Sequence, residues 1–410
     1  MGPASVQFAA VLQSLPGMIR FMNSSNSGTI AHRAPQGLAA KRRSPYAVPT
    51  GGQPRQEQTI DSVKTLRLPA DPENLHTPAA LDALDRAGRI LVSGGLVALP
   101  TETVYGLGAN ALDHDAVARI FAAKKRPSWD PVIVHVSTVV MAEALVSSIP
   151  SAARSLMHAF WPGPLTLLLP RGASIPDEVT AGRPLVGLRM PAHPVALALI
   201  RHTGLPIAAP SANLFGHTSP TTADHVLRDL DGRIDAILDA GPTRHGLEST
   251  VLDPTQSPMI IYRPGAITAE QIQAVGGPVV QYKLNRETAE IPPEGLPAPG
   301  VGMRHYAPAA PLVLVDAPLA ELGRRLAAAA RLLAGERIGV MLPAGVAAPH
   351  GAVCFSWGRW AALEDLARSL YAGLRSLDSQ GCTIILCPVP PPEGIGIAIR
   401  DRLFKAAKSA

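Results

Sequence analysis

The sequence predicts an α/β protein with two domains. Short apolar runs such as LVALP, TLLLP and TIILCPV alternate with stretches whose apolar residues recur at helical spacing, the pattern of strands packed against helices. A Pro- and Gly-rich stretch at residues 291–311 interrupts this alternation, which then restarts. The 410 residues also exceed what one hydrophobic core usually supports. We therefore expect two α/β units joined by an extended linker.

The domain boundaries follow from these shifts in composition. Residues 1–60 are rich in Ser, Gly, Pro and Arg, and no acidic residue precedes Glu57, so we expect a disordered, solvated extension or a misassigned start. An organellar transit peptide is the alternative. We expect a first domain at residues 61–268, a linker at 269–311 and a second domain at 312–410.

The first predicted domain begins near Val63. Thr77 is a suitable N-cap and Pro78 a favourable first helical residue, so a helix is expected to run from there to Gly94. Apolar periodicity places further elements along the chain. The other helices are expected at residues 115–125, 141–148, 152–160, 194–202 and 222–230, and the strands at 96–100, 132–136, 166–170, 186–191, 206–210, 236–241, 249–253 and 259–265.

The second predicted domain is a smaller, doubly wound, Rossmann-like α/β unit. GIGIAI at residues 394–399 matches GxGxxG only superficially, because it does not join a strand to a helix with an acidic residue about twenty positions on. We assign that glycine pattern to helix packing. The strands are expected at 312–315, 338–342, 352–357 and 383–389, and the helices at 318–333, 362–377 and 396–407.

Composition narrows the class of protein. A hydrophobic content of 47% with only 17% charged residues indicates a well-buried chain rather than a disordered one. The net charge of +5 is weak support for RNA binding, because much of it lies in the acid-free N-terminus. No apolar run is long enough to span a membrane. Cys354, Cys382 and Cys387 lack zinc-site spacing, so we expect reduced structural thiols in a cytoplasmic protein.

Polar and basic residues gather at predicted element ends in the first domain. PTETVYGLG follows strand LVALP and supplies hydroxyls such as Thr103, together with glycines that let backbone amides approach a ligand. The helix at 115–125 runs into Lys124 and Arg126, whose charges can neutralise an anion. Cations at a helix C-terminus also act as dipole caps, so this motif alone leaves both interpretations open.

Further polar residues interrupt or end apolar strands. His135 and Arg189 lie inside strands, where a lone histidine is usually a hydrogen-bonded core residue and a buried arginine needs an anion or a partner such as Glu248. PSAN places Ser211 and Asn213 at a strand end, and LEST and YRPG likewise place a polar residue or an arginine at a strand end. Turn chemistry explains each motif singly. Together, without a catalytic triad or a Walker motif, they predict a site that holds a phosphate-bearing ligand by side chains and turn amides.

The combined motifs resemble those of a known family. PTETVYGLG, KKRP, the SxN of PSAN, LEST, YRPG and GMRHYAP are similar to the motifs of the threonylcarbamoyl-AMP synthase family in its long form, a YrdC-like domain followed by a C-terminal domain. The resemblance covers about Leu66 to the end. It implies a twisted mixed sheet flanked by helices. It also implies condensation of L-threonine, bicarbonate and ATP to threonylcarbamoyl-adenylate and pyrophosphate, which feeds threonylcarbamoyladenosine formation in tRNA.

The resemblance also implies roles for individual residues, motif by motif. Lys124 and Arg126 correspond to catalytic cations, and Mg²⁺ is expected with ATP rather than at a resident metal site. The implied threonine and carbamate contacts are Thr103, His135, Arg189, Ala209 and Ser249. The implied ATP contacts are Arg126, Asp130, Ser211, Asn213, Ser219, Arg263 and Tyr306.

Partners and alternatives complete the expectations. The implied small-molecule partners are L-threonine, bicarbonate and ATP, with hand-over of the product to a tRNA threonylcarbamoyl transferase, weak tRNA contact and no membrane. We also expect the linker around residues 297–308 to close over the site as a lid. One alternative is an RNA-binding module without catalysis. It would explain the positive net charge, but not the motifs LEST and YRPG. A carbamoyl-transferring relative would ordinarily add acylphosphatase-like and zinc-finger segments, which the sequence does not show.

Overall fold

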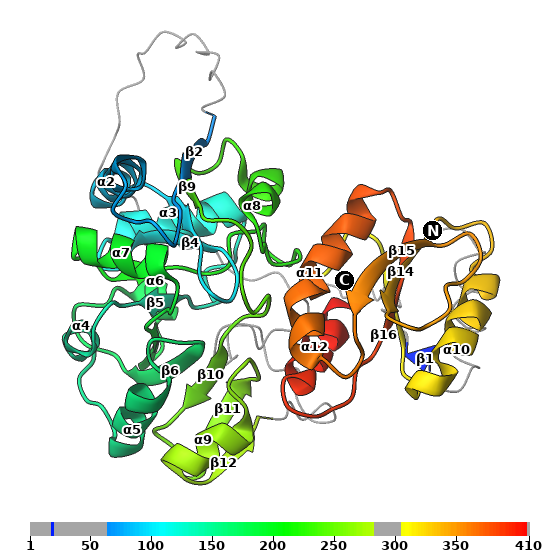
Figure 1. Ribbon diagram of the computed structural model, residues 1–410. Helices are drawn as coiled ribbons and strands as arrows, with labels where there is room; N and C mark the ends of the chain where they lie inside the picture. The colour runs from blue at the N-terminus through cyan, green and yellow to red at the C-terminus, as the bar shows by residue number, and fades with distance from the viewer. Residues whose placement is uncertain (1–17, 20–63, 283–304, 408–410) are drawn as a thin grey trace, which may run out of the picture.

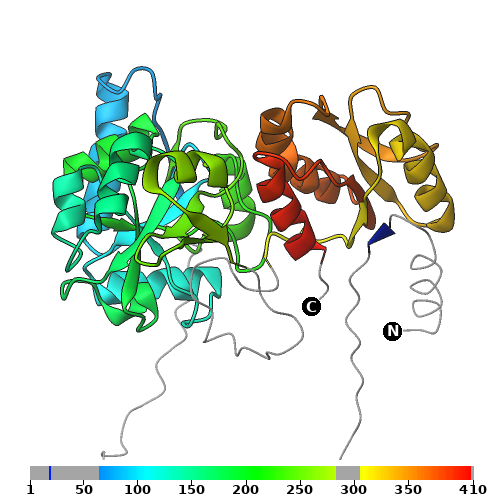
Figure 2. The same ribbon diagram turned by 90° about the horizontal axis from the view of Figure 1, so that it is seen from below.

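Two α/β domains lie side by side in the computed structural model, which describes residues 18–19, 64–282 and 305–407 (Figures 1 and 2). The predicted disordered extension at 1–60 lies outside the described residues except for Met18–Ile19, and most of the predicted lid lies outside them as well. Across the described part of the chain, no helix is both long and apolar enough to cross a membrane.

The first domain is built on an eleven-stranded sheet that mixes parallel and antiparallel pairs. The predicted mixed sheet is therefore confirmed. Its strands, in spatial order, are β12 (Val279–Gln281), β11 (Met259–Arg263), β10 (Thr250–Asp253), β6 (Leu165–Pro170), β7 (Leu185–Arg189), β5 (Ile133–His135), β8 (Ile207–Ala208), β4 (Gly106–Asn110), β3 (Val97–Leu99), β9 (Ala236–Asp239) and β2 (Leu66–Pro69).

Helices flank this sheet, and their ends follow local capping chemistry. The Thr77 hydroxyl accepts a hydrogen bond from the amide of Ala80, and the Asp113 carboxylate caps α3 in the same way. The helix α3 ends at Lys124, and the cap residue that follows, Lys125, takes a left-handed conformation. The helices are α2 (Pro78–Val92), α3 (His114–Lys124), α4 (Val139–Glu143), α5 (Ser151–Phe160), α6 (Asp177–Thr180), α7 (Pro194–Thr203), α8 (Ala223–Leu230) and α9 (Ala269–Gly276).

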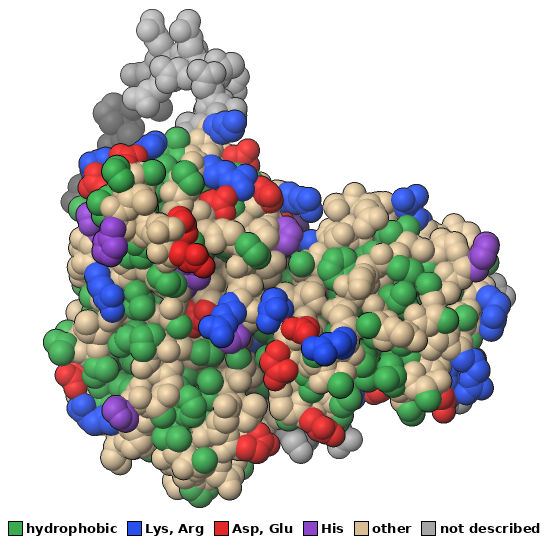
Figure 3. All heavy atoms as spheres, in the orientation of Figure 1, with side chains coloured by type: hydrophobic (Ala, Val, Ile, Leu, Met, Phe, Trp, Pro, Cys, Tyr) green, Lys and Arg blue, Asp and Glu red, His purple; other side chains and the backbone are tan. Residues whose placement is uncertain are grey.

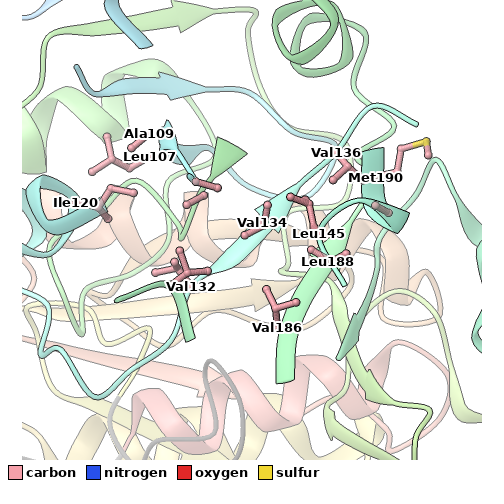
Figure 4. Packing of buried hydrophobic residues seen from close by; sticks show 14 of the residues in the cluster. Leu107, Ala109, Ile120, Val132, Val134, Val136, Leu145, Val186, Leu188 and Met190 are labelled. Carbon is pink, nitrogen blue, oxygen red and sulfur yellow. The ribbon is translucent and has the colours of Figure 1, made fainter. Parts of the chain in front are cut away.

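The core of the first domain lies between the sheet and these helices. Figure 4 shows part of it, where Val134 and Leu188 from neighbouring strands point toward Leu145, and Leu107 lies close to Ile120 of α3. All five side chains are buried. Such packing holds the strand backbones in fixed register, so polar residues on the same strands are held in place.

The second domain has a separate sheet whose strands are parallel apart from β1. In spatial order its strands are β1 (Met18–Ile19), β13 (Leu312–Val315), β16 (Ile384–Pro388), β14 (Ile338–Pro343) and β15 (Val353–Gly358). The helices α11 (Leu363–Ser379) and α12 (Gly396–Ala406) lie on the side facing the first domain, and α10 (Leu319–Leu332) lies on the far side (Figures 1 and 2). This arrangement confirms the predicted doubly wound unit.

The structure departs from the predicted elements in several places. PTETVYGLG is not only a strand-end turn, because β4 begins at Gly106 and forms a hairpin with β3. The helix predicted at 141–148 is the shorter α4. Past residue 268, α9 follows and β12 pairs with β11, so the first sheet continues into the predicted linker.

The two domains share a packed interface. Val104 and Leu247 of the first domain belong to one apolar cluster with Leu370 and Leu374 of α11. A Cβ added at Gly246 would overlap the backbone of Arg368, so the backbones of the two domains approach closely there. Acidic and basic side chains also lie near one another on the surface where the domains meet (Figure 3). The interface thus combines apolar packing with charged groups.

Candidate active site

Most of the predicted site residues line one cavity, which we name the central cavity, between the large sheet and the linker end. Its volume is about 60 Å³, room for a few water molecules. Nine predicted residues line it: Thr103, Arg126, His135, Arg189, Ala209, Ser211, Ser249, Arg263 and Tyr306. Four others are buried but do not line it: Lys124, Asp130, Asn213 and Ser219.

Strand direction explains how this cavity forms. His135 ends β5, Arg189 ends β7 and Arg263 ends β11, and the pairings through β6 and β10 give all three strands the same direction. The carboxyl ends of these strands therefore share one edge. However, β3 and β8 run the opposite way, so PTETVYGLG and PSAN reach the cavity from the other side. The cavity spans the short strand β5, whose Ile133 and His135 share a face.

Arg189 is fixed by groups of the PTETVYGLG segment. Its guanidinium lies 2.7 Å from the Glu102 carboxylate and donates to the Thr103 hydroxyl at 2.9 Å and to the carbonyl of Gly163 at 3.2 Å. Glu102, rather than the predicted Glu248, is therefore its acidic partner. Burial would raise the pKa of Glu102, but Arg189 outweighs it and lowers that pKa below its ordinary value.

His135 remains uncharged beside this ion pair. Burial, with the nearby Arg189 charge, lowers the pKa of the His135 imidazole to about 3. Its Nδ1 atom has no hydrogen-bond partner among the described residues. A neutral imidazole with a free nitrogen can accept from, or donate to, a ligand that enters the cavity.

Arg126 is held by the residues that follow it. It donates to the carbonyls of Asp130 at 3.0 Å and Pro131 at 2.8 Å, and its guanidinium lies 3.0 Å from the Asp130 carboxylate. Burial would raise the pKa of Asp130, but Arg126 and the nearby His305 lower it, so the carboxylate stays ionised. Asp130 therefore supports Arg126 from behind.

Lys124 braces the PSAN turn rather than facing the cavity. Its Nζ atom donates to the carbonyls of Ser211 and Asn213, and burial lowers its pKa well below the ordinary value. The Asn213 amide in turn donates to the carbonyls of Leu214 at 2.7 Å and His217 at 2.9 Å. The two signature residues thus shape the turn that presents Ser211. Their predicted ligand contacts stay predictions.

Arg263 and Ser249 form another part of the wall. Arg263 donates to the Ser249 carbonyl at 3.0 Å and to its hydroxyl at 3.1 Å, and that hydroxyl lies 2.8 Å from the Thr166 hydroxyl. Gly265 permits this arrangement, because a Cβ there would overlap the backbone of Ser249 and Thr250. The sequence motifs YRPG and LEST therefore meet as one structural unit.

Three polar lining residues were not among the predicted site residues. Thr101 lies 2.8 Å from Thr103, hydroxyl to hydroxyl, and His305 lies 3.6 Å from the Asp130 carboxylate. Glu248 accepts a hydrogen bond from the hydroxyl of Ser219. The motifs PTETVYGLG, LEST and GMRHYAP contained all three, so the signal was present in the sequence.

Three arginines, several hydroxyls and a neutral histidine line one cavity of a two-domain α/β protein, and this set of groups is suited to small anionic ligands. Residues 89–265 match a family model described as "Telomere recombination", and residues 267–408 match one described as "Threonylcarbamoyl-AMP synthase, C-terminal domain". The chain belongs to the threonylcarbamoyl-AMP synthase family.

Individual relatives support this membership over most of the chain. A threonylcarbamoyl-AMP synthase of Bacillus subtilis is 46% identical over 78% of this chain and 92% of the relative. One from Pyrococcus abyssi is 42% identical over 78% of this chain and 93% of the relative. The crystal structure of P. abyssi Sua5 complexed with L-threonine superimposes with a TM-score of 0.76 at 39% identity, covering 84% of this chain and 98% of that one.

Proposed function

We propose that this chain condenses L-threonine, bicarbonate or CO2, and ATP to L-threonylcarbamoyladenylate and pyrophosphate. The observation that carries the proposal is the central cavity, where Arg126, Arg189 and Arg263 face one space in a chain of this family. The threonine-bound structure of the P. abyssi relative supports threonine as the amino acid. The adenylate would serve a tRNA threonylcarbamoyl transferase that forms threonylcarbamoyladenosine.

The reaction places demands that these residues fit. The threonine amine, after losing a proton, attacks the carbon of CO2, and loss of a second proton from the nitrogen to solvent gives the carbamate. A carbamate oxygen then attacks the α-phosphorus of ATP, and the bond to the β-phosphate oxygen breaks to release pyrophosphate. Both reacting partners are anionic, so arginines that are already positioned lower the barrier by neutralising charge, without a covalent enzyme intermediate.

Magnesium fits this scheme as part of the nucleotide substrate. Among the described residues, no group of three or more His, Cys, Asp or Glu side chains is arranged to hold a metal ion. The ATP phosphates would carry the ion, which would add charge neutralisation at the leaving group. The side chains of the cavity would position the nucleotide itself.

The size of the cavity supports the lid hypothesis. A volume of about 60 Å³ cannot hold an adenylate, and His305 and Tyr306 form one wall. We expect this end of the linker to move when ATP and threonine enter. Protease sensitivity around residues 297–308 that both ligands together leave unchanged would contradict a lid.

The direct test is pyrophosphate release by the purified chain. We expect release only when threonine, bicarbonate and Mg-ATP are all present, with the adenylate product identified by mass spectrometry. Omission of any one substrate provides the control. Release without threonine, or tRNA binding with no release at all, would contradict the proposed reaction and favour a different ligand or an RNA-binding role.

A further inference from the structure

Buried side chains of the second domain hold a residue that lines the central cavity. Glu248 lines this cavity, yet two of its hydrogen-bond partners come from the second domain. Arg402 of α12 donates to Glu248 Oε2 at 2.8 Å, and the Tyr371 hydroxyl of α11 donates to the same oxygen at 2.9 Å. Both second-domain side chains are fully buried.

We propose that Arg402 and Tyr371 are positioning residues of the active site, which fix the Glu248 carboxylate and the Tyr306 ring in the cavity wall. The inference rests on the proposed function and gives the second domain a part in it. Neither side chain lines the cavity, so each acts through the residue that it holds.

The charge of Glu248 explains why an arginine is required. A carboxylate in a cavity for anionic ligands repels them and competes for the cavity arginines. Arg402, which does not line the cavity, neutralises Glu248, and its guanidinium also contacts Asp401 at 2.6 Å. With Glu248 held in this way, Arg263 on the first domain stays available to a phosphate group.

Tyr306 is held by the same two side chains. The Arg402 guanidinium lies 5.1 Å from the centre of the Tyr306 ring, and the Tyr371 ring stacks on it with centroids 5.9 Å apart. Tyr306 also takes a positive φ of 69°, a conformation that tyrosine rarely adopts without support from its surroundings. The second domain therefore supplies the support for this end of the linker.

A second interdomain ion pair provides a matched control. Arg375 of α11 lies 2.8 Å from the Asp229 carboxylate of α8, and both side chains are at least nine-tenths buried. Neither residue lines the central cavity. Loss of Arg375 thus weakens the same domain interface as loss of Arg402, but it leaves Glu248 paired.

The experiment compares Arg402→Met with Arg375→Met in the full chain. We expect Arg402→Met to lower kcat/KM for ATP by thirtyfold or more, and Arg375→Met by threefold or less, although both lower the Tm by similar amounts. Equal losses of kcat/KM in the two variants would overturn the inference and reduce Arg402 to a docking residue.

The pH profile provides a readout that docking alone would not change. Burial raises the pKa of Glu248, but Arg402 and Arg263, with hydrogen bonds, hold it below its ordinary value. The other groups that face Glu248 are Tyr371, Tyr306 and Ser219. Without Arg402 the carboxyl should protonate at higher pH, and protonation removes the charge that repels anionic ligands. The ratio of kcat/KM in Arg402→Met to that in the wild type should therefore rise as the pH falls, whereas the ratio for Arg375→Met should stay constant. A ratio for Arg402→Met that does not change with pH would contradict the proposal.

Two further measurements cover the remaining outcomes. If Arg402→Met does not fold, Tyr371→Phe keeps the stacked ring and removes only the hydroxyl. A three- to tenfold loss of kcat/KM is expected, with a smaller fall in Tm than Arg375→Met shows. Unchanged activity of Tyr371→Phe would contradict the role of that hydroxyl. ATP affinity, measured by calorimetry, separates the two proposals. A wild-type chain that releases no pyrophosphate overturns the proposed function, whereas equal ATP affinity in wild type and Arg402→Met overturns the positioning role.

Discussion

The two domains use their sheets in different ways. In the first domain, β5, β7 and β11 end in His135, Arg189 and Arg263, and all three residues line the central cavity. In the second domain, β13 and β16 end in Val315 and Pro388, and the domain reaches the cavity wall through the helices α11 and α12 instead. The same layered architecture thus supplies ligand-facing groups in one case and supporting groups in the other.

This difference has a physical basis in burial. Strand-end residues of the first domain face an open space that a ligand can fill: Arg189 is paired with Glu102, whereas Arg263 donates hydrogen bonds to the uncharged Ser249. The second domain turns a helical face toward the first, and there each buried cation, such as Arg402 or Arg375, has a carboxylate partner. Mutations should therefore affect chemistry most in the first domain and positioning in the second.

The largest effect is expected at a charge that faces the cavity. Arg126→Ala should lower turnover about a hundredfold, on the order of 3 kcal/mol of transition-state stabilisation, because we propose that its guanidinium, which lines the cavity, neutralises phosphate charge. The measurement is pyrophosphate release under saturating substrates. Arg126→Lys is the control, since it keeps the charge and loses the fork-shaped geometry. Wild-type turnover in Arg126→Ala would remove this cavity-facing charge from the mechanism.

A smaller effect on activity, with a clear effect on stability, is expected at Lys124. Lys124→Met leaves the buried carbonyls of Ser211 and Asn213 without their donor, so the free energy of unfolding should fall by about 2 kcal/mol. Turnover should fall with it, because the turn that presents Ser211 loosens. Urea unfolding measures the first quantity. Full stability with lost turnover would mean that Lys124 contacts the ligand directly.

The sequence predicts the residues that line the cavity better than the residues that hold them in place. Residues such as Arg189 and Ser211 interrupt or end apolar strands, so a local pattern marks them. Lys124 shows where prediction from the sequence stops. Its position indicates a charge at the end of a helix, but not that its side chain donates to a carbonyl of the PSAN turn. The pairing of Asp130 with Arg126 was likewise not readable from its motif, and its assigned ligand contact stays a prediction.

The features that the sequence could not predict depend on contacts between residues far apart along the chain. Arg402 lies 154 residues from Glu248 along the chain, and nothing in the local pattern of its helix distinguishes it from a solvent-exposed arginine. The parallel or antiparallel direction of β3 and β8 also depends on which strands they join. Alternation of strands and helices therefore predicted two α/β domains, while the pairing across them came only from the folded structure.

A third prediction concerns His135, the uncharged residue at the end of strand β5 in the first domain. The pKa of His135 is lowered to about 3, whereas an unfolded histidine titrates near 6.5. Between these values the unfolded chain binds the extra proton, so stability falls as the pH drops below 6.5, by about 1.4 kcal/mol for this group at pH 5.5. His225, with a pKa lowered to about 4, adds to the same trend.

Urea unfolding at pH 7.5 and pH 5.5 measures this loss. The variant His135→Asn should lose less stability between the two pH values than the wild type, because the group that must stay neutral is gone. His225 remains in both proteins and cancels from the comparison. If the variant and the wild type lose the same free energy of unfolding, His135 is charged or solvated in the folded protein.

The smallest effect is expected at a strand end of the second domain. Asp316 directly follows β13 and lies 3.0 Å from Arg400, with both side chains partly exposed to solvent. Asp316→Asn should change the free energy of unfolding by less than about 1 kcal/mol, since partly exposed ion pairs contribute little. Turnover should stay within twofold of the wild type, because this edge of the sheet lies apart from the central cavity. A tenfold loss at unchanged stability would show that the second sheet also presents functional groups at its strand ends, and the contrast between the domains would fail.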